Sequence, residues 1–312
     1  MILVCGEALI DVLENGDDAR RLAAGGGPFN TARALARLDI PTAFLGHLST
    51  DAYGRELAGL LRSDGVNLDL TTTGPEPTTI AVAKVDNNGL AEYEFLVEGT
   101  SAPNLTRVMV PEKLSAEINA LHVGTLGLVL EPMASTLAAL MKRESGRILI
   151  MLDPNVRQIG ASDPVYRDRL ESVIPLSTIV KASVQDMAWL YPGLDYKSAA
   201  ARMLERGVRL VVVTLGMDGA FAATEEFSVA AAAPAINVVD TVGAGDTFGA
   251  ALLARLFDYH LVQPDPKLDN SQVKSALRFA CVAAAITCSR SGADPPYRSE
   301  LQLDEALESS ES

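Results

Sequence analysis

The sequence predicts an α/β fold with a central, mostly parallel β-sheet, helices on both faces and a small antiparallel β lid. First, apolar strand-like runs alternate with amphipathic helical stretches along most of the chain, a rhythm typical of parallel sheets covered by helices. Second, two strand-like runs in the segment 78–97 flank the turn signal Asp86-Asn87-Asn88-Gly89 and predict a hairpin. Third, no repeat or low-complexity linker interrupts the 312 residues, so we expect a single domain over 1–312.

The elements are expected to begin with a strand at 2–4, which continues as a second strand at 8–13 after the polar interruption Gly6-Glu7. A glycine loop follows from Gly25. We expect the lid to comprise approximately residues 12–24 and 75–100 and to lie over the main sheet. Further strands are expected at 41–48, 121–123, 147–152, 178–180 and 210–214, and helices at 31–38, at 51–62 and twice after residue 240.

Composition excludes several classes of protein. The net charge of −14 and the pI near 4.7 argue against a nucleic-acid binder, because a polyanion would be repelled. No apolar run reaches the length of a membrane span, and the first residues lack the basic segment of a signal peptide. We therefore expect a cytoplasmic protein without membrane or nucleic-acid partners.

Cysteine and histidine spacing gives no support for a metal centre. The three cysteines lack CxxC spacing and are expected to be reduced, buried and inert, and the three histidines are scattered along the chain. A zinc site or a Ser/His/Asp triad is therefore not expected.

The run DTVGAGD, from Asp240 to Asp246, carries the strongest chemical signal. Its small residues precede a helical stretch, so the glycines are expected at a helix N-terminus, where amide hydrogens without helical acceptors attract anions. The carboxylate of Asp246 would lie beside a bound phosphate and could accept the proton of an attacking hydroxyl. An ordinary strand-to-helix turn with an acidic residue is the alternative. Neither a GxxxxGK[ST] loop nor a GxGxxG dinucleotide loop is present in the required context.

Five ordered motifs resemble the PfkB carbohydrate kinase family from the first strand to the last helices. The two family signatures are GGGPFNTARALARL from Gly25 and DTVGAGDTFGA from Asp240. Between and before them stand GEALID at 6–11, DPNVR at 153–157 and TLGMDGA at 214–220. The resemblance implies a ribokinase-like fold and ATP-dependent phosphorylation of a primary hydroxyl of a small sugar.

The resemblance also implies roles for individual residues in catalysis and sugar binding. Asp246 would be the general base, the backbone amides of Gly243, Ala244 and Gly245 would form the anion hole, and Arg157 would reach the phosphates. The sugar would be bound, together with Asp246, by Asp11, Gly26, Gly27, Asn30 and Asn155. Each of these residues also has a simpler interpretation, as a turn, a helix cap or, for Arg157, a surface salt bridge.

The nucleotide would be bound by residues from three further segments and from the glycine run. The family's N-x-x-E segment corresponds to Ser183-Val184-Gln185-Asp186, so Asp186 is a candidate Mg²⁺ residue acting through water. ATP and Mg²⁺ are the implied cofactors, and a monovalent cation such as K⁺ is a further candidate. A hairpin turn is the alternative interpretation for Thr214, Gly216 and Gly219, and plain helix packing explains Ala284 equally well. The complete set of nucleotide residues is Lys181, Ser183, Thr214, Gly216, Gly219, Gly243, Gly245 and Ala284.

The lid bears on which sugar is used. Acid-sugar kinases of this family usually carry an arginine at the end of the second lid strand, whereas 95–99 reads FLVEG. We therefore expect a neutral sugar, with fructose ahead of ribose. A 2-keto-3-deoxygluconate kinase, a ribokinase, a nucleoside kinase and a catalytically inactive sugar-binding protein remain alternatives. The exposed edge of the lid predicts a homodimer formed through it.

Overall fold

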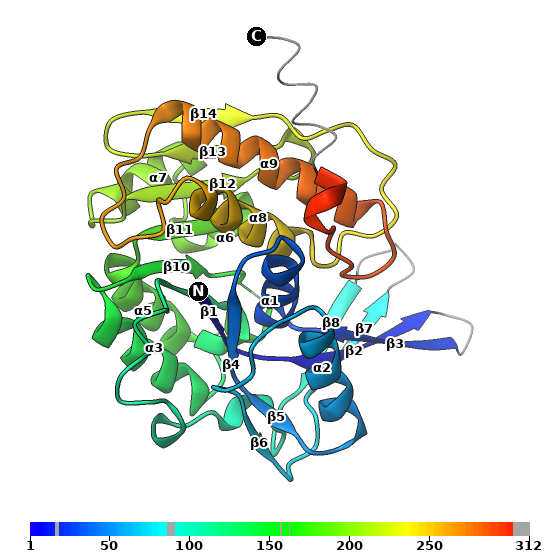
Figure 1. Cartoon of the computed structure of the whole chain (residues 1–312). Helices are drawn as coiled ribbons and strands as arrows, with labels where there is room; N and C mark the ends of the chain where they lie inside the picture. Colours follow the sequence, from blue (N-terminus) through cyan, green and yellow to red (C-terminus); the bar gives the residue numbers. More distant parts are fainter. Residues whose placement is uncertain (16–18, 86–90, 157, 162, 302–312) are drawn as a thin grey trace.

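A computed structural model describes residues 1–15, 19–85, 91–156, 158–161 and 163–301. Its main sheet has the strand order β14-β13-β12-β11-β10-β9-β1-β4 (Figure 1). The strands from β4 to β12 are parallel, and β13 and β14 form an antiparallel edge that the sequence did not predict. The bounds are β1 Ile2–Cys5, β4 Thr42–Leu45, β9 Ala120–Gly124, β10 Leu149–Asp153, β11 Ile179–Ser183, β12 Leu210–Thr214, β13 Ala220–Ala223 and β14 Ser228–Ala231.

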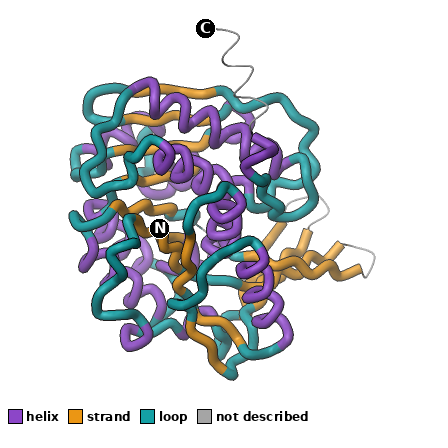
Figure 2. The backbone as a smooth tube through the Cα atoms, viewed as in Figure 1, coloured by secondary structure: helices purple, strands orange, loops and turns teal. Residues whose placement is uncertain are grey.

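Helices cover both faces of this sheet, as the alternating pattern predicts (Figure 2). Along β1, Ile2 and Val4 face one hydrophobic cluster while Leu3 and Cys5 face the other, because successive side chains of a strand point to opposite faces. The first cluster includes α1 Gly27–Arg37, α2 Ala52–Ser63, α8 Ala244–Asp258 and α9 Asn270–Cys288. The second includes α3 Met133–Glu144, α5 Pro164–Val173, α6 Val184–Leu190 and α7 Tyr196–Leu204.

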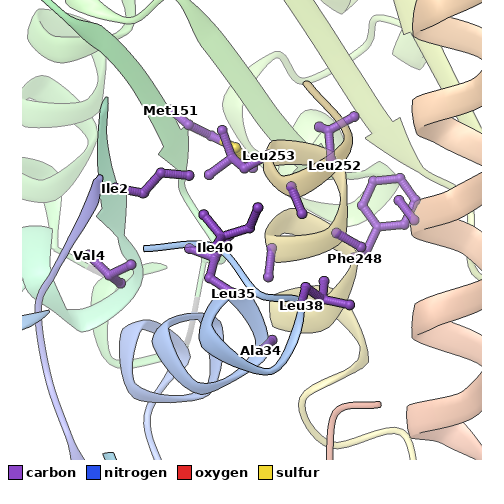
Figure 3. Close-up of a cluster of buried hydrophobic side chains, with 14 of the residues drawn as sticks. Ile2, Val4, Ala34, Leu35, Leu38, Ile40, Met151, Phe248, Leu252 and Leu253 are labelled. Atoms are coloured by element: carbon purple, nitrogen blue, oxygen red, sulfur yellow. The ribbon is translucent and has the colours of Figure 1, made fainter. Parts of the chain in front are cut away.

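The packing of α1 against α8 determines how the chemical residues meet. Leu35 and Leu38, from and just after α1, lie in one apolar cluster with Phe248 and Leu252 of α8 (Figure 3). The N-terminal turns of the two helices contribute Gly27 and Asn30 from α1 and Asp246 from α8 to a single cavity. Helix α4 Gln158–Ala161 is a single short turn before α5.

The expected strand at 41–48 is divided in two. Strand β4 stays in the main sheet, whereas β5 His47–Ser49 leaves it to pair with β6 Thr72–Gly74. Gly46 stands at the division, where an added Cβ would lie 2.7 Å from the Gly6 carbonyl oxygen. The close approach of two backbones therefore requires the glycine.

The lid is a second sheet with the strand order β3-β2-β7-β8, which protrudes from the main body (Figure 1). Its bounds are β2 Leu9–Asn15, β3 Ala19–Gly25, β7 Ile80–Val85 and β8 Ala91–Leu96. Two antiparallel pairs, β2–β3 and β7–β8, are joined by a parallel β2–β7 pairing. The pairing aligns Ala23, Asp11, Ala81 and Phe95 in one row across the sheet. The expected turn at 86–89 lies outside the described residues.

Candidate active site

Two cavities meet at Thr241 and Gly245, which line both of them. The polar cavity, of about 450 Å³, lies beyond the carboxyl ends of β1, β9, β10 and β11 and under the lid, where open α/β sheets place ligands. The apolar cavity, of about 650 Å³, lies between the β12–β13 turn and helices α8 and α9. The polar cavity brings together most of the predicted site: Asp11, Gly26, Gly27, Asn30, Asn155, Lys181, Ser183, Asp186, Gly243, Gly245 and Asp246.

Asp246 lines the polar cavity directly after Gly245, in the first turn of α8, with 7% of its surface exposed. Asn30 Nδ2 donates to Asp246 Oδ2 over 2.9 Å. A Cβ added to Gly27 would lie 3.3 Å from Asp246 Oδ1 and 2.6 Å from Thr125 Cγ2. The glycine therefore lets the start of α1 approach the carboxylate closely.

The N-terminus of α8 has the geometry of an anion site. Gly243 is its N-cap with φ +76°, and an added Cβ would lie 2.5 Å from the Ala293 side chain. The first amide hydrogens of a helix have no helical acceptor and carry the positive end of its dipole. The Ala244 amide donates weakly, over 3.3 Å, to the Thr241 carbonyl. Ala244 itself lines the apolar cavity, so the GAGD run spans both.

Glu7 is a buried acid of the polar cavity that the sequence did not assign to the site. Its Oε1 accepts hydrogen bonds from Thr125 Oγ1 at 2.6 Å and from the Gly27 amide at 3.3 Å. Burial, together with the charge of Asp246, raises the pKa of Glu7 to about 7. Its place in GEALID, directly after the first strand, was the available signal. Nothing local in the sequence indicated Thr125, whose contact with Glu7 spans 118 residues.

A buried ion pair supports the floor of the polar cavity. Lys181 Nζ, on β11, donates to Asp153 Oδ2, at the end of β10, over 2.8 Å. Burial would lower the pKa of Lys181, but the charges of Asp153, Asp246 and Asp186 outweigh it and raise that pKa. The pair keeps a cation below the start of α8, since a Cβ on Gly245 would lie 3.3 Å from Lys181 Nζ. Burial and Lys181 lower the pKa of the neighbouring His122 to about 3, so its imidazole is neutral.

Asp186 lines the polar cavity but is also a structural cap. Its Oδ2 accepts from the Ser183 amide at 2.7 Å and its own amide donates to Ser183 Oγ at 3.0 Å, forming a capping box at the start of α6. Its Oδ1 accepts from the Val156 amide at 2.8 Å. This bond holds the loop in which Asn155 adopts a left-handed φ of +40°. Arg157, predicted to reach the phosphates, lies outside the described residues.

The apolar cavity contains the residues predicted for the nucleotide loop and the helix wall, namely Thr214, Gly216, Gly219, Gly245 and Ala284. The TLGMDGA run is indeed a hairpin turn between β12 and β13, and the same turn lines the cavity. By contrast, Lys181, Ser183 and Gly243 line the polar cavity. Sequence reasoning missed Met217, Ile236, Val238 and Phe248.

Two cysteines also line the apolar cavity, Cys281 and Cys288. The three cysteines are free, as expected, but Cys288 is half-buried where burial was predicted. In the part of the chain that the structure describes, no group of three or more His, Cys, Asp or Glu side chains is arranged to hold a metal ion. Among the same residues, no helix is long and apolar enough to span a bilayer.

Comparison with known proteins places this chain in a family. The model of the pfkB family carbohydrate kinase matches residues 1–300. The chain belongs to this family. It is 38% identical over 304 residues to a fructokinase of Rhizobium leguminosarum bv. trifolii, covering 96% of this chain and 88% of that one. It is 30% identical to fructokinase-1 of Oryza sativa subsp. japonica, covering 92% and 89%.

Solved structures agree with the family assignment. A fructokinase from Vibrio cholerae O395 in its fructose, ADP and calcium ion bound form superimposes with a TM-score of 0.85 at 26% identity, covering 97% of both chains. A fructokinase from Xylella fastidiosa with bound ATP shares the fold, with a TM-score of 0.87 at 23% identity over 98% of both chains. The predicted fold and the carbohydrate kinase class are confirmed, and the chain is a transferase with an alcohol acceptor.

Proposed function

We propose that this chain, acting as one kinase unit over residues 1–312, transfers the γ-phosphoryl group of ATP to a primary hydroxyl of fructose. The observation that carries the proposal is the position of Asp246. It lines the polar cavity next to Gly245, where the two cavities meet, in the first turn of α8, with Asn30 holding its carboxylate. An acceptor hydroxyl in the polar cavity and a phosphate at the helix start would therefore meet at one carboxylate.

Each part of the junction would have a separate chemical role. Asp246 would accept the proton of the attacking hydroxyl as the new P–O bond forms. The amides of Gly243, Ala244 and Gly245 would stabilise the charge on the transferring phosphoryl oxygens, with the weak Ala244 bond to Thr241 giving way. Lys181, held by Asp153 below Gly245, adds positive potential at the same point.

The polar cavity suits a neutral polyhydroxyl ligand. Its charged groups are the carboxylates of Asp11, Asp186 and Asp246 and one described cation, Lys181, which is already paired with Asp153. Carboxylate oxygens such as those of Asp11 and Asp246 accept hydrogen bonds from sugar hydroxyls. A carboxylate-bearing sugar would be repelled. The fructokinase relatives and the fructose-bound neighbour favour fructose over ribose within this class.

The apolar cavity suits the adenine end of ATP, because flat apolar bases are bound by walls such as Phe248, Ile236 and Ala284. Thr214, Gly216 and Gly219 would lie along the nucleotide. Mg²⁺ would be held chiefly by the phosphates themselves, since the described residues offer no three-ligand cluster, with Asp186 contributing through water. The metal ion would neutralise phosphate charge. A monovalent cation such as K⁺ is part of the same proposal.

The lid supports the proposal of a homodimer. Leu22 on β3 and Leu96 on β8 are 50% and 47% exposed on the two edge strands of the lid sheet. Exposed apolar edges of this kind are commonly covered by a partner. We place the enzyme in the cytoplasm, where its two substrates would be available.

The test is a coupled ATP assay with fructose, ribose, 2-keto-3-deoxygluconate and adenosine as acceptors. We expect the highest kcat/KM with fructose. Preference for the acid sugar would contradict the charge argument, and preference for ribose or adenosine would contradict the sugar assignment. Undetectable transfer to every acceptor would favour an inactive sugar-binding protein.

A further inference from the structure

Glu7 occupies an unusual position for a residue outside the expected site. It follows the central strand β1, is 2% exposed, and shares the polar cavity with Asp246. One carboxylate oxygen, Oε1, accepts from both Thr125 Oγ1 and the Gly27 amide. The other, Oε2, is fully covered and has no hydrogen-bond partner among the described residues. The acid therefore ties two chain segments together through a single oxygen.

Both segments lead directly to the base. Gly27 begins α1, the helix whose Asn30 donates to Asp246 Oδ2, and a Cβ on Gly27 would touch Thr125 and approach Asp246 Oδ1. Thr125 has a left-handed φ of +51°, a strained conformation for a β-branched residue that surrounding contacts must hold in place. The Thr125–Glu7 bond at 2.6 Å is such a contact. A shift of Glu7 would therefore displace the parts that position Asp246.

The missing hydrogen-bond partner of Oε2 indicates which protonation state of Glu7 holds Thr125 and Gly27 in place. A buried, ionised oxygen without a donor is costly, whereas a neutral carboxyl in the same place is much less so. The charged groups sharing the cavity from the elements around it are Asp11 of β2, Lys181 of β11, Asp186 of α6 and Asp246 of α8. Lys181 is paired with Asp153, and the Asp246 charge disfavours ionisation of Glu7.

We propose that Glu7 is a positioning residue for Asp246 and that it acts in its neutral, protonated form. The inference rests on the proposed function, because it assigns Asp246 as the base. When Glu7 loses its proton, a second negative charge appears near the base, and of the two carboxylate oxygens only Oε1 has donors to stabilise it. Repulsion between the carboxylates of Glu7 and Asp246 then displaces the base from its position beside Asn30, and sugar phosphorylation falls.

Glu7→Gln tests this directly, because glutamine keeps an acceptor oxygen for Thr125 and Gly27 but cannot ionise. With a pKa near 7, wild-type kcat/KM for fructose should fall above pH 7 relative to the variant. The ratio of variant to wild type should rise from about 1 at pH 6 towards roughly tenfold at pH 8, since about a tenth of Glu7 is then neutral. The matched control is Glu56→Gln on the exposed surface of α2, which should leave the ratio flat.

Thermal unfolding gives a readout that needs no activity. A carboxyl whose pKa is raised by folding loses its stabilising effect as pH rises from the unfolded value, 4.5, through about 7. The Tm of Glu7→Gln minus the Tm of wild type should therefore increase from pH 5 to pH 8. The same difference for Glu56→Gln should stay constant. Inactive wild type would contradict the proposed function, whereas this stability difference would still report on Glu7.

Thr125→Val provides a second variant should Glu7→Gln fold poorly. In wild type the Thr125 hydroxyl donates to Oε1 and thereby lowers the pKa of Glu7. Because the variant lacks this hydroxyl, the pKa of Glu7 should rise, and the alkaline fall in kcat/KM should move to higher pH. Superimposable pH profiles for wild type, Glu7→Gln and Thr125→Val, together with unchanged relative Tm values, would overturn the proposal.

Discussion

The two cavities that meet at Gly245 are built on opposite principles. In the polar cavity, side chains hold one another: Asn30 donates to Asp246, Thr125 donates to Glu7, and nearby Lys181 donates to Asp153. In the apolar cavity, the walls are aliphatic and aromatic side chains and small residues of α9. One cavity is a network of fixed donors and acceptors, and the other is a shaped apolar slot.

This difference indicates which cavity determines the choice of acceptor and which one recognises the nucleotide. A ligand that fails to match buried donors and acceptors leaves polar atoms unpaired, so the polar cavity can discriminate strongly among acceptors. An apolar slot recognises size and shape with smaller penalties. Changes in the polar cavity should therefore affect turnover and acceptor use, and changes in the apolar cavity should affect the nucleotide alone.

The largest effect is expected for Asp246→Asn. Loss of the base should lower kcat by roughly 100-fold or more with little change in the KM for ATP, since the apolar cavity is untouched. Steady-state kinetics in both substrates checks this. Asp265→Asn is the control, because Asp265 is largely exposed and pairs with Arg209 at 3.3 Å, an interaction of small value. Near-normal turnover in Asp246→Asn would contradict the assignment of the chemistry to the polar cavity.

An intermediate effect is expected for Ala284→Leu, which fills part of the apolar cavity from α9. Overpacking of about 1.4 kcal/mol corresponds to a roughly tenfold rise in the KM for ATP, while the KM for fructose should hold. Val282→Leu enlarges a side chain of the same helix that does not line the cavity and serves as the control. Equal rises in both KM values would show that the cavities do not act separately.

The smallest effect is expected at the base of the lid. Asp51 caps α2 through the Gly54 amide and accepts from both the amide and the hydroxyl of Thr78, just before β7. Asp51→Ala should cost about 1 kcal/mol of stability. It should also raise the KM for fructose by less than Ala284→Leu raises that for ATP.

The same residue gives a pH dependence of known sign. Burial alone would raise the pKa of Asp51, but hydrogen bonds from Thr78, Gly54 and Ser49 lower it to about 2. The stability that ionised Asp51 contributes to the fold is therefore present above pH 3.8, its ordinary pKa, and is lost as pH falls towards 2. The Tm difference between wild type and Asp51→Ala should narrow from pH 5 to pH 3. Asp51→Asn, which keeps a capping side chain, separates the cap from the charge.

Local sequence determined the parts of this protein whose geometry depends on neighbouring residues. The alternation of strands and helices, the start of α8 after GAGD and the glycines of the polar cavity follow from short-range spacing and backbone freedom. The alternation was enough to predict the α/β class, whereas the kinase class came from the resemblance of five motifs to a family, and GAGD alone predicted only a phosphate near a carboxylate. The division of 41–48 into β4 and β5 and the β13–β14 edge were not evident, because sheet pairing decides them.

Only the tertiary structure decided which distant groups meet. The Asn30–Asp246 bond spans 216 residues and the Thr125–Glu7 bond spans 118, and no periodicity encodes either. The structure also showed Lys181 paired with Asp153 under the polar cavity and Asp186 serving as a cap. Burial explains why this matters: the protonation of Glu7 depends on the water excluded around it and on Asp246 nearby, which exist only once the chain has folded.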